Sequence, residues 1–225
     1  MASLPNIFSR LVRARAAAWM LLALAAAAMG SGCRLGTADA AMKGRDLFET
    51  CAACHGQLGE GNPEFGAPNI AGMQSWYVES QLKKFRSGAR GAHFSDLEGM
   101  RMRPMAMSLD SDEAVQIVAN YVGSLPTVGS SPTIDGDVPA GDSAYHLACA
   151  ACHGPNGEGN EALKAPRLTG VADWYLALQL RKIKGGIRGS SPLDIEGRLM
   201  SVFARQLADE EAIRNVVAYL DTLKP

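Results

Sequence analysis

The chain has 225 residues, a length that fits one large domain or two of about 100 residues each. Hydrophobic residues make up 47% and charged residues 20% of the sequence, values that exclude global disorder. The 22 basic and 23 acidic residues give a net charge of -1, so the chain lacks the basic excess that nucleic-acid binding requires, and we predict no nucleic-acid partner.

The first forty residues, 1–40, are predicted to be an export signal. A basic start is followed by an uncharged Ala/Leu-rich run over 16–32, and the stretch ends at Ala40 in the A-x-A pattern that signal peptidase prefers. We expect cleavage after Ala40. Two alternatives stay open: lipidation at Cys33, or retention of the apolar run as a membrane anchor. Each places the rest of the chain in the periplasm and leaves membrane association through the N-terminus open.

The remainder of the chain is an internal repeat. The sequence Cys-Ala-Ala-Cys-His-Gly at 51–56 recurs at 149–154, a shift of 98 residues. At this shift, without a gap, 31 of the 71 positions that begin at Cys51 are identical to those that begin at Cys149. Between the copies lies a stretch rich in Pro, Gly and Ser, which is typical of a linker. The predicted first domain, linker and second domain are 41–127, 128–140 and 141–225.

Within each copy the apolar residues recur at helical spacing, and no alternation favours strands, so the predicted fold class is all-α. A short helix should lead into each Cys motif, and a second helix should run over about 75–86. A third should begin at Ser111, a good N-cap residue followed by acids, with a counterpart from Asp209 to Leu220. Loops that contain Gly and Pro are expected between these helices.

The Cys motifs have the C-x-x-C-H spacing of covalent haem attachment, in which two thiols add to the vinyl groups and the histidine binds iron. Three residues along a helical turn place both sulfurs on one side. A thioredoxin-type pair would need a βαβ setting, and the two pairs of a zinc site would lie far closer than the 94 residues between Cys54 and Cys149. We therefore predict two covalently attached haem c groups, held by Cys51, Cys54 and His55 and by Cys149, Cys152 and His153.

The repeat also selects a distal iron ligand. The first copy contains Met100, Met102, Met105 and Met107, whereas the same window of the second copy contains only Met200. Met102 maps onto Met200, and the spacing from histidine to methionine is 47 residues in both copies. The predicted iron ligands are therefore Met102 and Met200, and the other three first-copy methionines remain alternatives in that copy.

The order of these motifs resembles dihaem cytochrome c4 and, more widely, class I cytochromes c. C-x-x-C-H is followed by Pro-x-(Ile/Leu)-x-Gly, by Trp-Tyr with Gln-Leu, and by a methionine ahead of an acid-rich helix start, in both halves of 42–225. The resemblance implies two tandem all-helical class I cytochrome c domains, each around one haem. It also implies electron transport in the periplasm, from a quinol:cytochrome c reductase-type donor to a terminal oxidase-type acceptor.

The same resemblance implies roles for residues around each haem. The carbonyl oxygens of Pro68 and Pro166 should accept a hydrogen bond from the Nδ1–H of the iron-binding histidines, which fixes the ring. Four aromatic residues should contact either the haem propionates or the partner domain; alternatively, they line each haem pocket as part of the core. This aromatic set is Trp76, Tyr77, Trp174 and Tyr175. Because fast transfer between haems needs close edges, we expect the two domains to pack together with these edges near the interface.

The predicted function is that of an electron carrier rather than an enzyme. The alternatives are the haem-bearing electron-acceptor subunit of a periplasmic dehydrogenase complex and a dihaem peroxidase. A peroxidase needs one iron with a displaceable ligand, and equivalent methionines in both copies argue against it. The basic runs are interpreted as solvated helix faces or, alternatively, as docking sites for a partner; they comprise Lys83, Lys84, Arg86 and Arg90 with Arg181, Lys182, Lys184 and Arg188.

Overall fold

The computed structural model describes residues 39–223, so residues 1–38 of the predicted export signal lie outside the described residues. The chain divides into two units, Met1–Met42 and Lys43–Pro225, and the second unit contains both repeats. Among the described residues, no helix combines the length and the apolar character needed to span a membrane.

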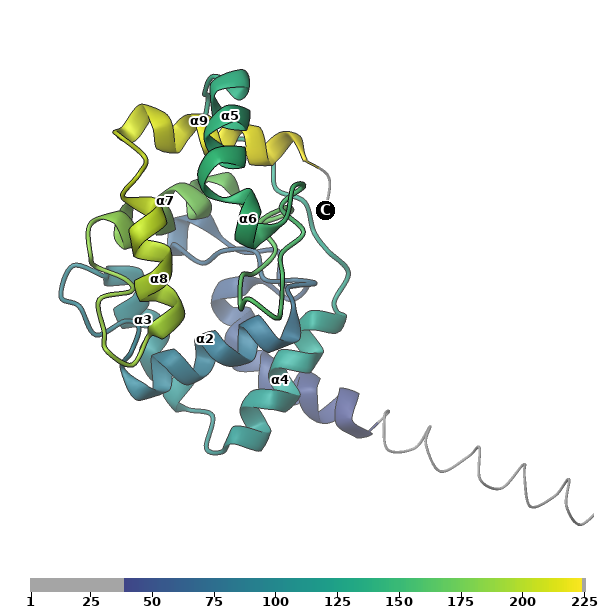
Figure 1. The fold of residues 1–225 in the computed structure, drawn as a ribbon. Helices are drawn as coiled ribbons and strands as arrows, with labels where there is room; N and C mark the ends of the chain where they lie inside the picture. Colours follow the sequence, from purple (N-terminus) through teal and green to yellow (C-terminus); the bar gives the residue numbers. More distant parts are fainter. Residues whose placement is uncertain (1–38, 224–225) are drawn as a thin grey trace, which may run out of the picture. The chain divides into compact units, whose positions relative to one another are not determined.

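The first repeat is built from helices (Figure 1). These helices surround an aliphatic and aromatic core. Helix α2 packs against both α3 and α4. Leu82 and Phe85 of α2 meet Val115, Val118 and Val122 of α4 in this core. The elements in chain order are a helix described over 39–55, the 3-10 helix η1 (Pro63–Phe65), α2 (Ser75–Ser87), α3 (Leu97–Met107) and α4 (Asp112–Ser124).

The second repeat has the same plan, with its own core. Helix α9 packs against α5 and α7, and α7 packs against α8. The fully buried Tyr145 and Val217 lie at the centre of this core, beside Ile213, Val216 and Leu220. The elements are α5 (Val138–Ala148), α6 (Ala150–His153), α7 (Asp173–Lys184), α8 (Ile195–Ala204) and α9 (Glu210–Thr222).

The all-α prediction is confirmed for the part of the chain that the structure describes. The only β-type pairings there are two isolated bridges, Asn62 with Ala67 and Asn160 with Ala165. The helix expected over 75–86 is α2, and Ser111 is the N-cap of α4, because its hydroxyl accepts a hydrogen bond from the N–H of Ala114 at 3.1 Å.

Helices α3 and α8 occupy segments that were expected to be loops. Pro104 lies inside α3, where it lacks the N–H that would bond to the carbonyl of Met100, so the sequence there discourages a helix prediction. Asp96 and Asp194 nonetheless cap the starts of these helices with their side chains. Helix α5 begins at Val138, inside the segment predicted as a linker.

The segment between the repeats is bound at defined points. The buried carboxylate of Asp173 accepts hydrogen bonds from the backbone N–H groups of Thr133 at 2.5 Å and Ile134 at 2.7 Å. The side-chain amide of Asn69 donates to the carbonyl oxygens of Val128 at 3.1 Å and Gly170 at 2.7 Å. The first contact ties the segment to the second repeat, and the second joins the segment to both repeats.

Candidate haem sites

Each repeat contains a cavity that opens beside its Cys motif. The cavity of the first repeat has a volume of about 250 Å³ and that of the second about 170 Å³, and apolar surface dominates the walls of both. The structure brings the residues predicted to hold haem onto these walls: Cys51, Cys54, His55, Pro68 and Met102 in the first, and Cys149, Cys152, His153, Pro166 and Met200 in the second.

The cysteines lie on the helical turns that precede the histidines, and none of these four is in a disulfide. Burial raises the pKa of Cys51 and of Cys149 to about 11. Both thiols are therefore protonated at neutral pH, whereas the attacking thiol of a thioredoxin-type pair has a lowered pKa. Their environment agrees with an attachment role and not with thiol–disulfide exchange.

The two histidines are buried and identically oriented. His55 and His153 are 7% and 6% exposed, and the Nδ1 atom of each lies 2.8 Å from a carbonyl oxygen, that of Pro68 or Pro166. Burial lowers the pKa of both rings below their usual 6.5, so both are neutral at pH 7. With the proton on Nδ1 donated to the proline carbonyl, Nε2 keeps its lone pair free to bind a metal.

A glycine allows the proline segment to approach the histidine. Gly61 has φ +85°, and a Cβ at this position would lie 2.4 Å from the backbone nitrogen of Asn69. Gly159 has φ +84° and stands in the same relation to Arg167. A side chain at either position would push the proline segment away from the ring, which explains the second glycine of the Gly-Glu-Gly-Asn sequence in both copies.

The distal-ligand candidates lie on α3 and α8. In the first repeat, Met102 and Met105 line the cavity, whereas Met100 and Met107 lie outside its walls and are 47% and 56% exposed. The position equivalent to Met105 is Phe203, which lines the second cavity beside Met200. The structure therefore narrows the distal-ligand candidates of the first copy to Met102 and Met105. Only Met102 aligns with a methionine, Met200, in the second copy.

The four predicted aromatic residues differ in placement. Tyr77 and Tyr175 line both cavities, each from its own repeat, so the two cavities share part of a wall. Trp76, of the first repeat, lines the cavity of the second, and Trp174 lines neither cavity. The aromatic set is thus partly pocket and partly interface, and Trp174 belongs to neither cavity wall.

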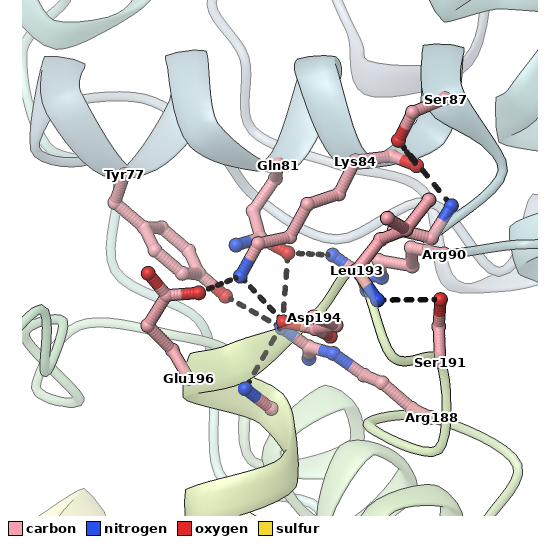
Figure 2. A network of polar contacts seen from close by, with 12 residues as sticks. Tyr77, Gln81, Lys84, Ser87, Arg90, Arg188, Ser191, Leu193, Asp194 and Glu196 are labelled. Atoms are coloured by element: carbon pink, nitrogen blue, oxygen red, sulfur yellow. Dashed lines mark hydrogen bonds and ion pairs between the residues drawn. The ribbon is translucent and has the colours of Figure 1, made fainter.

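A polar network joins the repeats between the cavities, and sequence reasoning did not find it (Figure 2). The guanidinium of Arg90 donates to the side-chain oxygens of Gln81 at 2.9 Å and Gln179 at 3.1 Å, and to the hydroxyl of Tyr175 at 2.8 Å. Arg188 makes the reciprocal bonds, to Gln179 at 2.8 Å, Gln81 at 3.0 Å and the hydroxyl of Tyr77 at 3.2 Å.

Two lysines extend this network as ion pairs. Lys84 binds the carboxylates of Asp194 at 2.6 Å and Glu196 at 2.8 Å, and Lys182 binds Asp96 at 2.5 Å and also Glu98. The interpretation of the whole basic runs as solvated faces or docking sites is therefore wrong for Lys84, Arg90, Lys182 and Arg188, which are held between the repeats. Lys83, by contrast, is exposed and pairs with Glu79 on its own helix.

The chemistry of the cavities fits a haem. Four buried donors have no hydrogen-bond partner among the described residues: Trp76 Nε1, Arg90 Nε, Arg103 Nε and Arg188 Nε. Arg103 lines neither cavity. Arg90 lines the first cavity, and Trp76 and Arg188 line the second. Since unpaired buried donors are costly, carboxylate groups such as haem propionates suit these positions. Each cavity also offers two thiols, one imidazole nitrogen and a thioether around an apolar space.

Comparison with curated proteins gives relatives of the same chemistry. The chain is 33% identical over 177 residues to a thiosulfate dehydrogenase electron acceptor of Stutzerimonas stutzeri (strain A1501), covering 72% of this chain and 73% of that protein. It is 30% identical over 195 residues to cytochrome c4 of Azotobacter vinelandii, covering 81% of this chain and 89% of that protein.

Solved structures agree. Reduced recombinant cytochrome c4 from Pseudomonas stutzeri superposes with a TM-score of 0.66 at 29% identity, covering 81% of this chain and 98% of that one. The thiosulfate dehydrogenase TsdBA from Marichromatium purpuratum gives a TM-score of 0.64 at 30% identity, and this chain spans 40% of that longer chain. The Cytochrome c family model matches twice, over residues 41–126 and 138–224. The chain therefore belongs to the Cytochrome c family, as a dihaem electron carrier with two covalently attached haem c groups.

Proposed function

We propose that the chain relays single electrons between protein redox partners in the periplasm, with one histidine and one methionine on each iron. The observation that supports this is the pair of equivalent cavities with a shared wall, each lined by two cysteines, a buried neutral histidine and a methionine. When bound, haem c supplies an iron that alternates between two oxidation states, and His/Met ligation favours a high reduction potential.

The protein's own residues have separate tasks in this proposal. The thiols of Cys51, Cys54, Cys149 and Cys152 anchor the groups covalently. His55 and His153 bind iron through Nε2, held in orientation by the proline carbonyls at 2.8 Å. Met102 and Met200 would supply the second protein ligand of each iron. The buried Nε atoms of Arg90 and Arg188 and the Trp76 indole provide donors for propionates.

Transfer within the chain is tested by partial photoreduction of the fully oxidised protein with less than one electron per molecule. Because Tyr77 and Tyr175 each line both cavities, we expect the electron to redistribute between the haems at a rate independent of protein concentration. A rate proportional to protein concentration would mean that electrons move only between molecules, and the relay would be rejected.

Haem attachment and the position of the N-terminus are tested together by intact mass measurement of the native protein. The mass should equal that of the chain cleaved after Ala40 plus two haem groups, and the excess should survive acid-acetone extraction. A mass that reports one haem, or haem that extracts freely, contradicts the attachment sites. A lipidated Cys33 or an uncleaved start changes the chain mass and leaves the haem count unaffected.

A second candidate function is that of electron acceptor for a periplasmic dehydrogenase. The relationship to the thiosulfate dehydrogenase electron acceptor supports it. If this role applies, thiosulfate and catalytic amounts of a purified thiosulfate dehydrogenase should reduce the oxidised protein, as followed by its visible haem bands. Absence of reduction, with an active enzyme and an artificial acceptor as control, would remove this substrate class.

A further inference from the structure

The helices that carry the two distal-ligand methionines begin at aspartates that are bound from the opposite repeat. Asp194 is the N-cap of α8, and its carboxylate accepts a hydrogen bond from the N–H of Gly197 at 3.0 Å. The same carboxylate binds the Nζ of Lys84, from α2 of the first repeat, at 2.6 Å (Figure 2). The Asp194 side chain is 2% exposed, so this contact is largely shielded from water.

The arrangement is reciprocal. Asp96 caps α3 through the N–H of Gly99 at 3.1 Å and binds the Nζ of Lys182, from α7, at 2.5 Å. Each lysine also binds a second carboxylate in the first turn of the same helix: Lys84 binds Glu196, and Lys182 binds Glu98. Each distal-ligand helix is therefore held at its first turn by one lysine of the other repeat, and the two lysine side chains are 14% (Lys84) and 6% (Lys182) exposed.

The first turn is shaped for this contact. A Cβ on Gly197 would lie 2.2 Å from Oδ2 of Asp194, and a Cβ on Gly99 would lie 2.1 Å from Oδ2 of Asp96. Only glycine leaves room for a carboxylate that bonds to the helix start and to the lysine together. These lysines, aspartates, glutamates and glycines are identical between the two copies, although Lys83 and Arg86 on the same helix are replaced by Arg181 and Lys184.

The helix transmits this hold to the methionine. Met200 lies six residues after Asp194, and Lys84, Asp194 and Met200 all line the second cavity. Lys182, Asp96 and Met102 line the first in the same way. Within its own repeat α8 packs against α7, and α3 packs against α2. The lysine of the other repeat holds the first turn of each of these helices.

We propose that Lys84 positions Met200 and Lys182 positions Met102, so that each repeat stabilises the iron–thioether bond of the other. The proposal rests on the proposed function, in which these methionines are the distal ligands. The lysine acts through the helix N-cap and does not touch the iron. The consequence is a crossed dependence: removal of a lysine weakens ligation in the repeat to which that lysine does not belong.

The test is displacement of the thioether by imidazole in the holo-protein, followed through the thioether-to-iron absorption band and the methionine methyl signals in NMR spectra. Met102→Ala and Met200→Ala assign the signals to each haem. In Lys84→Met, we expect half-displacement at the second haem at about tenfold lower imidazole, the effect of losing one charge-assisted hydrogen bond, with the first haem unchanged. Lys182→Met should show the opposite pattern.

Matched variants decide the outcome. Lys83→Met removes an exposed lysine one residue away on α2 and should leave both haems unchanged, and Lys84→Arg should restore most of the wild-type imidazole resistance. Equal weakening of both haems by either lysine variant would show a general interface effect and overturn the proposal, as would a Lys84→Met protein that behaves like Lys83→Met.

A further variant covers the case in which Lys84→Met does not fold. Asp194→Asn keeps the side-chain oxygen that caps Gly197 and removes the charge that binds Lys84, and it should weaken the second haem alone. Retention of the second haem's thioether band in Met200→Ala would instead reject the ligand assignment of the proposed function. Loss of that band in Met200→Ala, together with an unchanged imidazole response in Lys84→Met, would reject only the positioning role of Lys84.

Discussion

The histidine–proline contacts show how single residues prepare each site. A neutral ring with Nδ1 bonded to a carbonyl presents Nε2 in one fixed direction, and the same 2.8 Å contact occurs in both repeats. Burial also raises the pKa of Cys51 and of Cys149, because their surroundings keep water away from the thiols and so disfavour the charged thiolate. The residues of each site are thus set for a large apolar ligand.

The distal ligands give a residue-level prediction. Met200→Ala should abolish the thioether-to-iron band of the second haem and leave that of the first, because Met200 is the only methionine on the second cavity wall apart from Met73 of the first repeat. Met102→Ala should do the reverse. Optical and NMR spectra of the oxidised proteins measure this effect.

Met105→Leu is the matched control, since Met105 lines the first cavity at the position where the second copy has phenylalanine. Both thioether bands should persist in this variant. Loss of the first band in Met105→Leu, together with its retention in Met102→Ala, would move the distal ligand to Met105.

At the scale of elements, the helix starts contribute measurable stability. Asp209 caps α9 by accepting from the N–H of Ala212 at 2.9 Å, and α9 packs against both α5 and α7. Asp209→Ala should lower the free energy of unfolding by about 1 kcal/mol, as measured by denaturant unfolding of the holo-protein. Asp209→Asn retains a capping oxygen and should stay within a few tenths of a kcal/mol; equal destabilisation by both would assign the effect to charge.

The same scale shows what sequence alone could predict. The apolar spacing of α2 and the Ser111 cap of α4 are local signals, and both elements were found where expected. Helix α3 was missed because Pro104 and the scarcity of periodic apolar residues discourage a helix, whose stability here comes from packing and from the Asp96 cap. Tertiary contacts overrode local propensity there. Helix α8 has no proline, and its Ile195, Leu199 and Val202 follow helical spacing, so the sequence did contain a signal for it.

The cross-repeat contacts were missed for another reason. A charged residue on a helix is by default assigned to solvent, and Lys84 finds its partner Asp194 110 residues away in the sequence. One signal was available: Gln81, Lys84 and Arg90 recur unchanged in the second copy, although their charged neighbours vary. Side chains that are identical in both copies, next to charged residues that differ, indicate that they make the same structural contacts in each copy.

At the scale of the whole molecule, the interface should respond to acid. Hydrogen bonds from Lys182 and Lys84 hold the pKa of Glu98 and of Glu196 below their ordinary 4.5. Carboxylates with a lowered folded-state pKa stabilise the protein above the unfolded value, and that stability is lost as the pH falls through the folded value. Thermal midpoints should therefore fall more steeply below about pH 4.5 in the wild type than in Glu98→Gln/Glu196→Gln; parallel curves would contradict this.

The haems should also serve as structural core. Each matched domain spans fewer than 100 residues, and each cavity is large and mostly apolar. A chain that cannot attach haem, with all four motif cysteines replaced by alanine, should be largely unfolded by circular dichroism, because an unfilled cavity removes much of the packing in a small domain. Native-like helix content in that variant would show that the polypeptide core suffices.

The reciprocity of the interface has a consequence for how the chain holds together. Contacts in which a residue of one copy meets a residue of the other, and the reverse pair meets likewise, have the form of a two-fold dimer surface. Joining the copies by a short segment makes their association unimolecular, at an effective concentration on the order of millimolar. An interface of only about 4 kcal/mol, too weak to pair separate molecules at micromolar levels, is then half closed, and each further 1.4 kcal/mol closes it tenfold more. Weak individual contacts, each made twice, are therefore enough to hold the two repeats together.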